Sequence, residues 1–135
     1  MTDSSTFLAG KRCLVLDDEF LIALDIQQTL EAAGAIVISI SSAEEALDAL
    51  HGGAKFDLAV LDIKLSGKAR NSTSVAALLS ERGTPFVYLT GMSVDHVQAQ
   101  SFPAAPVVEK PYELAALMAA LRTALDADGE PDRAA

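Results

Sequence analysis

One apolar run that ends in a carboxylate, Asp57-Leu58-Ala59-Val60-Leu61-Asp62, constrains the fold of this chain most. Successive apolar positions indicate a strand that is buried on both faces, as in a parallel sheet covered by helices. Asp62 then stands where the strand emerges, at the sheet edge where open α/β folds place their ligands. An aspartate at such a position can also simply begin a turn, so the rest of the chain has to decide between the two interpretations.

Four further apolar runs predict strands, and helical patterns separate them. The strands are expected at residues 12–16, 35–40, 85–90 and 106–109, and the helices at residues 21–33, 42–52, 75–83 and 111–126. Ser42 followed by Glu45 is a capping box that opens the second helix, and Gly34 is well placed to end the first. Residues 64–71 are predicted as a polar loop, and residues 91–103 give only a weak helical pattern.

The alternation of strands and helices predicts the fold class. Strand–helix–strand units give a parallel sheet with right-handed crossovers. We therefore expect a doubly wound five-stranded parallel sheet of the flavodoxin-like kind, with helices on both faces. Residues 11–126 are predicted to form one domain, with a flexible N-terminus at residues 1–10 and a disordered charged tail at residues 127–135.

Composition excludes some classes of function. A formal net charge of −9 disfavours direct binding to DNA or to an anionic membrane, because both need clustered cations. No apolar run is long enough for a signal peptide or a membrane-spanning helix. Cys13 is the single cysteine, so no intrachain disulfide can form. A cytoplasmic protein without membrane insertion is expected.

The polar residues that follow the predicted strands should meet at one edge of the sheet. They are Asp17 and Asp18 after the first strand, Asp62 after the third, Thr90 after the fourth and Lys110 after the fifth. Each of them alone has an ordinary structural explanation, but the coincidence at one edge favours a site. Converging carboxylates repel each other unless a cation lies among them, and oxygen ligands with open positions suit Mg²⁺.

This set of residues also suggests a reaction. Asp62 can act as a nucleophile toward a phosphoryl group and form an aspartyl phosphate. Lys110 supplies a second positive charge, and the Thr90 hydroxyl can donate a hydrogen bond to a phosphoryl oxygen. The metal would neutralise charge on the transferred group.

The same segments resemble the motifs of response-regulator receiver domains of the CheY-like kind. The similarity covers roughly residues 10–126 and rests on four segments in order: Leu14-Val15-Leu16-Asp17-Asp18-Glu19, Leu61-Asp62, Leu89-Thr90-Gly91 and Glu109-Lys110-Pro111-Tyr112. The resemblance implies phosphotransfer to Asp62 from the phosphohistidine of a sensor histidine kinase. It also implies Mg²⁺ held mainly by Asp18 and Asp62, with the Lys64 backbone carbonyl as a further ligand and Asp17 acting through water. Thr90 would be the switch hydroxyl and Lys110 the family's lysine.

A narrower resemblance is to the "FAT GUY" receivers. In Pro85-Phe86-Val87-Tyr88-Leu89-Thr90-Gly91-Met92 the match is partial, since Tyr88, Leu89 and Ser93 stand at the Phe, Ala and final Tyr positions. Most receivers carry an aromatic residue three positions before the lysine, where this chain has Val107. FAT GUY receivers also lack that aromatic residue, so the usual coupling between the threonine and an aromatic side chain is not expected here.

The favoured function is a stand-alone phosphoacceptor in two-component signalling rather than an enzyme. It would act through a downstream protein partner, or through a phosphotransferase as a relay or sink. Two alternatives stay open: a pseudo-receiver that only binds partners, and a phosphohydrolase with an aspartyl nucleophile. The complete set of site residues disfavours the first. Lys64 disfavours the second, because it stands where such a hydrolase commonly has an acid or base.

Overall fold

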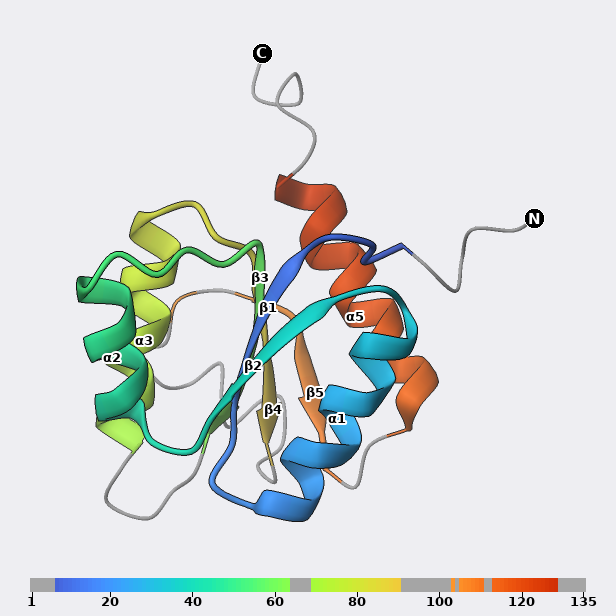
Figure 1. Cartoon of the computed structure of the whole chain (residues 1–135), viewed down its shortest axis with the longest axis horizontal. Coiled ribbons are helices and arrows are strands. Elements are labelled where there is room, and N and C mark those ends of the chain that lie inside the picture. Colours follow the sequence, from blue (N-terminus) through green and yellow to red (C-terminus); the bar gives the residue numbers. More distant parts are fainter. Residues whose placement is uncertain (1–6, 64–68, 91–102, 104, 111–112, 129–135) are drawn as a thin grey trace.

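A five-stranded parallel sheet with helices on both faces forms the domain (Figure 1). The computed structural model describes residues 7–63, 69–90, 103, 105–110 and 113–128. The strand order is β2-β1-β3-β4-β5, and every neighbouring pair is parallel. This is the order of a flavodoxin-like doubly wound sheet, so the predicted fold class is confirmed.

Strands and helices alternate from β1 to β4, and β5 and α5 complete the elements of the described residues. Their bounds are β1 Arg12–Leu16, α1 Phe20–Ala32, β2 Ile36–Ile40, α2 Ala43–His51, β3 Leu58–Ile63, α3 Ala69–Glu81, β4 Phe86–Thr90, β5 Val107–Glu109 and α5 Leu114–Asp128. Ser42 Oγ accepts a hydrogen bond from the Glu45 backbone N–H, so the predicted cap of α2 is present. Gly34 follows α1 with a φ of 101°, which an L side chain rarely adopts.

Two apolar cores lie on opposite faces of the sheet. Alternate residues of one strand point to opposite faces, so Cys13 and Val15 of β1 pack with α1 and α5, whereas Leu14 and Leu16 pack with α2 and α3. Figure 1 shows the same division, with α1 and α5 on one side of the sheet and α2 and α3 on the other. Burial on both faces explains why β1, β3 and β4 read as continuous apolar runs.

Two helix starts differ from the prediction. α3 begins at Ala69, inside the stretch predicted as a loop, and α5 begins at Leu114 rather than at Pro111. Residues 69–74 contain few apolar side chains, so they carry no periodic pattern that would mark a helix. Residues 64–68, 91–102, 104 and 111–112 lie outside the described residues, and so does most of the weak segment 91–103.

The N-terminal segment before β1 is packed against the domain, which corrects the expectation of a flexible stretch at residues 1–10 for residues 7–10. Leu8 is fully buried in the core formed with α1 and α5. Its backbone N–H donates to the Ala33 carbonyl at 3.2 Å. The Arg122 guanidinium of α5 lies 4.0 Å from the centre of the Phe7 ring. These contacts give residues 7–10 a fixed place at the start of the sheet.

No helix among the described residues is long and apolar enough to cross a membrane. The cytoplasmic location stays a prediction.

Candidate functional site

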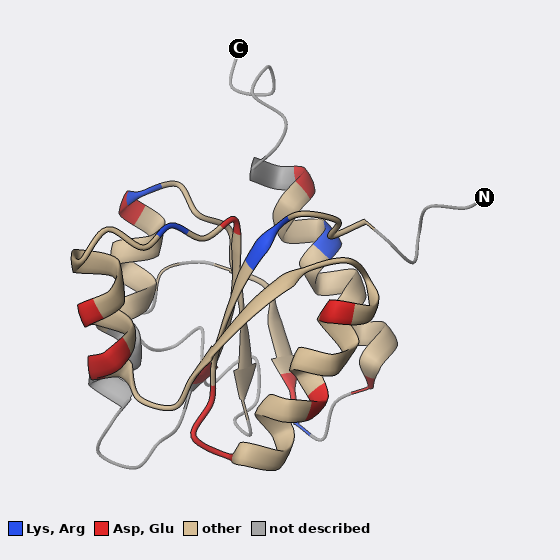
Figure 2. Ribbon diagram, viewed as in Figure 1, with Lys and Arg blue, Asp and Glu red and all other residues tan. Residues whose placement is uncertain are grey.

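Three acidic residues follow β1 directly and form the turn into α1. Asp17 is almost fully buried, with 3% of its surface exposed, while Asp18 and Glu19 are exposed. Asp17 continues the pairing with β2, since its N–H donates to the Ile40 carbonyl, and Asp17 Oδ1 accepts a hydrogen bond from the Glu19 N–H at 2.8 Å. Figure 2 shows this acidic connection between β1 and α1.

Asp62 lies beside this turn, near the end of β3. Its side chain is 4% exposed, and carboxylate oxygens of Asp17, Asp18 and Asp62 all lie within 4.8 Å of one another. The three predicted carboxylates are thus brought together at the carboxyl edge of the sheet. They come from two adjacent strands, because β1 pairs with β3 in register Leu16 to Leu61.

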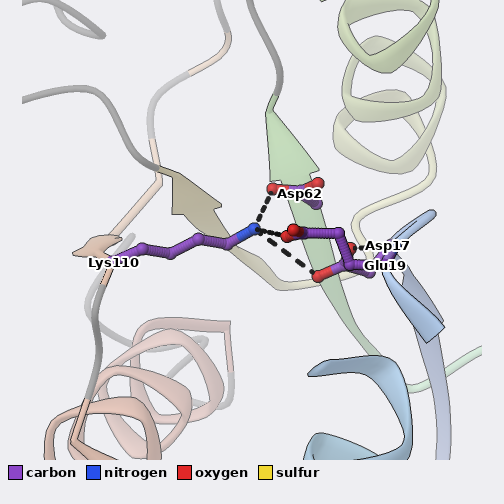
Figure 3. A network of polar contacts seen from close by, with 4 residues as sticks. All are labelled: Asp17, Glu19, Asp62 and Lys110. Atoms are coloured by element: carbon purple, nitrogen blue, oxygen red, sulfur yellow. Dashed lines mark hydrogen bonds and ion pairs between the residues drawn. The ribbon is translucent and has the colours of Figure 1, made fainter. Parts of the chain in front are cut away.

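Lys110 reaches two of these carboxylates, and that of Glu19, from the end of the edge strand β5. It follows β5, and its Nζ lies 2.9 Å from Asp62 Oδ1, 3.0 Å from Glu19 Oε1 and 3.7 Å from Asp17 Oδ2 (Figure 3). The Lys110 backbone N–H donates to the Thr90 carbonyl, which holds the residue after β5 at the end of β4. One ammonium group therefore faces three carboxylates that belong to two other elements.

Burial and like charge shift the ionisation of Asp17. Burial raises the pKa of Asp17 to about 6, and the neighbouring charge of Asp62 adds to the rise. The hydrogen bond from the Glu19 N–H and the positive charge of Lys110 act in the opposite direction but do not cancel it. Removal of the carboxylate from water is therefore the main reason why its charged form is disfavoured.

Lys110 shows the complementary effect. Burial alone would lower the pKa of Lys110, but hydrogen bonds to Asp62 and Glu19 and the charges of Asp62 and Asp17 outweigh it, so the pKa lies above its ordinary value. The ammonium group stays charged throughout the physiological range. It therefore supplies a permanent positive charge beside Asp62.

Thr90 ends β4, the strand next to β3. It is fully buried, and its partner across the strands is Ile63, one residue past Asp62. The position beside it on β5 carries Glu109, and Val107 pairs with Tyr88. Tyr88 belongs to the core between the sheet and helices α2 and α3. Its ring packs edge-on against Phe86, and its hydroxyl donates to the Pro103 carbonyl at 2.6 Å.

Sequence reasoning overlooked one residue of the site, Glu19. The Asp-Asp-Glu triplet was visible, but only the side-chain direction shows that Glu19 rather than Asp18 contacts Lys110. Lys64, expected to offer a backbone carbonyl, lies outside the described residues.

The donor set is suited to a hard divalent cation. It consists of carboxylate oxygens at the ends of two adjacent strands, with Asp18 exposed and the other two residues buried. Asp17 Oδ2 is buried and accepts no hydrogen bond from any described residue, so it has capacity for a cation. The cluster could therefore hold a metal ion beside the Asp62 carboxylate.

The sequence pattern of the response regulator receiver domain matches residues 13–122. Among curated proteins, the chain is similar to the uncharacterized transcriptional regulatory protein YkoG of Bacillus subtilis (strain 168), with 31% identity over 118 residues. The match covers 86% of this chain and 51% of YkoG, so the chain spans about half the length of that relative.

Solved structures agree with this match. A response regulator receiver protein from Sinorhizobium medicae WSM419 has a TM-score of 0.71 and 29% identity, over 87% of this chain and 96% of that one. A CheY-like receiver domain from Methanospirillum hungatei JF-1 has a TM-score of 0.76 and 26% identity, over 90% of this chain and 98% of that one. The response regulator PhyR from Brucella abortus has a TM-score of 0.79 and 26% identity, over 98% of this chain and 54% of PhyR. With the sheet order and the match over residues 13–122, these findings show that the chain belongs to the response regulator receiver domain family.

Proposed function

We propose that this chain is a phosphoacceptor of two-component signalling, which takes a phosphoryl group on Asp62 from the phosphohistidine of a sensor histidine kinase. The observation that carries the proposal is the joint position of the buried Asp62 carboxylate, the Asp17 and Asp18 carboxylates and the Lys110 ammonium at one edge of the sheet. Receiver domains are generally phosphoacceptors rather than enzymes, and we assign this chain the same role.

The chemistry requires a carboxylate that can reach phosphorus and positive charge that can balance the phosphoryl oxygens. An Asp62 oxygen attacks the phosphorus atom, the bond from phosphorus to the histidine nitrogen breaks, and the imidazole leaves with the electron pair and takes up a proton. Lys110, already 2.9 Å from Asp62, can donate to a phosphoryl oxygen. Thr90, at the end of β4, is proposed as the hydroxyl that donates to another.

We further propose Mg²⁺ as the metal, with Asp18 and Asp62 as direct ligands, Asp17 acting through water and the Lys64 carbonyl as a further ligand. When bound, Mg²⁺ supplies positive charge to the transferred group. Two observations support this assignment: the three carboxylates lie together, and the buried Asp17 Oδ2 accepts no hydrogen bond from any described residue.

The kinase has to dock beside Asp62, and an exposed apolar pair borders the site. Phe20 and Leu21, in the first turn of α1, are 74% and 76% exposed. They follow the acidic turn directly, so a partner helix packed on them would lie next to the carboxylates. Large exposed apolar side chains beside a polar site favour a protein contact. We propose this pair as the place where the kinase binds.

The phosphorylation test uses a small donor, so that it does not depend on the identity of the kinase. Acetyl phosphate with Mg²⁺ should label the wild-type chain, and Asp62→Asn should remain unlabelled. Asp57→Asn is the matched control, because Asp57 is exposed and lies just before β3, at the opposite end of that strand from Asp62. Equal labelling of Asp62→Asn and the wild type would place the phosphoryl group on another residue, and no labelling of either protein would favour a partner-binding pseudo-receiver.

A further inference from the structure

Glu19 occupies a helix-capping position without capping the helix. It is the N-cap residue of α1, with an extended backbone, but its side chain makes no capping hydrogen bond. Instead Glu19 Oε1 lies 3.0 Å from Lys110 Nζ, across 91 residues of sequence. An N-cap side chain normally satisfies one of the free N–H groups of the first turn. Here the side chain contacts the site instead.

Glu19 is joined to the site at two points. Its backbone N–H donates to Asp17 Oδ1 at 2.8 Å, and its carboxylate accepts from Lys110. This backbone hydrogen bond holds the Glu19 backbone in place beside Asp17, and so restrains the position from which the side chain extends. Figure 3 shows the Glu19 and Asp62 carboxylates both directed at the Lys110 ammonium.

Lys110 needs such a partner. A lysine side chain has a flexible four-carbon stem, and holding its ammonium group in one place costs conformational entropy. Two carboxylates lie within hydrogen-bond distance of Lys110 Nζ, those of Asp62 and Glu19, while Asp17 is farther away at 3.7 Å. When Asp62 is phosphorylated to an acyl phosphate, one of its oxygens no longer carries the charge that attracts Lys110. Glu19 then remains as the near carboxylate that takes no part in the reaction.

We propose that Glu19 is a positioning residue for Lys110. It keeps the ammonium group at Asp62 before the phosphoryl group arrives and retains it there while the Asp62 carboxylate is consumed. The consequence for phosphotransfer rests on the proposed function, whereas the restraint on Lys110 does not. Glu19 itself need not touch the phosphoryl group.

Two substitutions separate contact from charge. Glu19→Asp keeps the negative charge, but its shorter side chain is a good helix N-cap and is expected to turn to the first N–H groups of α1, away from Lys110. Glu19→Gln loses the charge but keeps an acceptor oxygen at the same reach. Glu19→Asp should fold at least as stably as the wild type because it gains a cap. Loss of the fold therefore does not obscure the result.

The first readout is the Lys110 ammonium group itself, in the protein without phosphate or metal. Nitrogen-15 NMR follows the exchange of its protons with water, and Lys110→Arg assigns the signal. We expect exchange roughly tenfold faster in Glu19→Asp than in the wild type, since a charge-assisted hydrogen bond is lost. Unchanged exchange in Glu19→Asp would overturn the proposal.

The second readout is the rate of labelling by acetyl phosphate at saturating Mg²⁺. Glu19→Asp should be slowed roughly fivefold, the effect of losing one partly exposed ion pair, and Glu19→Gln should be slowed less. A change in Glu19→Gln with none in Glu19→Asp would show a general charge effect and overturn the proposal. If even the wild type takes up no phosphoryl group, the proposed function fails, and the exchange experiment still decides the role of Glu19.

Discussion

At the scale of single residues, the balance of charge around Asp62 determines the properties of the site. The Lys110 ammonium group lies near the carboxylates of Asp17, Glu19 and Asp62, and burial, together with the charge of Asp62, raises the pKa of Asp17. The sequence predicted that these aspartates and the lysine would lie at one edge, because each lies at or just after the carboxyl end of a parallel strand. The role of Glu19 could not be predicted, since a side chain on a turn can point in several directions.

Asp17 should make the stability of the metal-free protein depend on pH. Its pKa is about 6 in the folded chain against an ordinary 3.8, so the folded state binds a proton more tightly than the unfolded state. The free energy of unfolding should therefore be highest below pH 3.8, as far as this group contributes, and fall as the pH rises to about 6. In Asp17→Asn this fall should disappear.

Urea unfolding with a chelator present, measured across this pH range, checks the prediction for Asp17. Above pH 6, Asp17→Asn should be more stable than the wild type by on the order of 1 kcal/mol. The Lys110 contribution does not interfere, because its raised pKa matters only in alkaline solution. A wild-type pH profile in Asp17→Asn would show that Asp17 is not the group that titrates.

Asp18 should be needed for metal binding although it is exposed. Asp18→Ala removes one of three carboxylates, so Mg²⁺ affinity measured by calorimetry should fall roughly tenfold or more. The same change should raise the stability of the metal-free protein, because it relieves repulsion between like charges. Asp48→Ala, on the exposed side of α2, is the control and should bind Mg²⁺ like the wild type. Unchanged affinity in Asp18→Ala would remove it from the ligand set.

At the scale of elements, the sequence predicted the strands and helices that have a clear apolar pattern and misplaced the helix start that has none. The strands were found because each is a continuous apolar run. The start of α3 was placed too late, because residues 69–74 carry few apolar side chains. Leu8 was overlooked because a single apolar residue in a short segment has no pattern, and its burial depends on α1 and α5, which are distant in sequence.

Leu8 should contribute to stability as a core residue does. Leu8→Ala leaves a cavity beneath α1 and α5, so the free energy of unfolding should fall by about 2–4 kcal/mol. Leu21→Ala makes the same chemical change at a position that is 76% exposed and should have almost no effect. Guanidinium unfolding of both variants compares the two. If Leu8→Ala were as stable as Leu21→Ala, residues 7–10 would not belong to the folded domain.

At the scale of the whole molecule, the parallel sheet gives the domain two unlike ends. The carboxyl edge carries the acidic turn and Asp62, while Lys11, Arg12, Lys55 and Arg82 lie at the opposite ends of the strands (Figure 2). The sequence predicted the acidic edge, because all strands run in one direction, but it did not predict the basic residues at the opposite end. The exposed pair Phe20 and Leu21 lies beside the carboxyl edge, at the start of α1, so its proposed role in kinase docking can be tested by substitution.

Phe20→Ala and Leu21→Ala should distinguish docking from chemistry. Transfer from a phosphorylated cognate kinase should slow roughly tenfold, since a large exposed apolar side chain at an interface contributes more than 1 kcal/mol. Labelling by acetyl phosphate should be unchanged, because neither residue belongs to the carboxylate cluster. Ile36→Ala, an exposed apolar residue at the amino end of β2, is the control. Normal kinase transfer in both α1 variants would place the docking surface elsewhere.

The position of the phosphoryl group on the labelled chain tests the central claim most directly. After labelling with acetyl phosphate and Mg²⁺, borohydride reduces an aspartyl phosphate to homoserine, and peptide mass spectrometry locates the altered residue. We predict homoserine at position 62 and nowhere else in the chain, because Asp62 is the buried carboxylate that Lys110 contacts at 2.9 Å. Homoserine at another aspartate, or a phosphate that resists borohydride on a serine or threonine, would contradict the account.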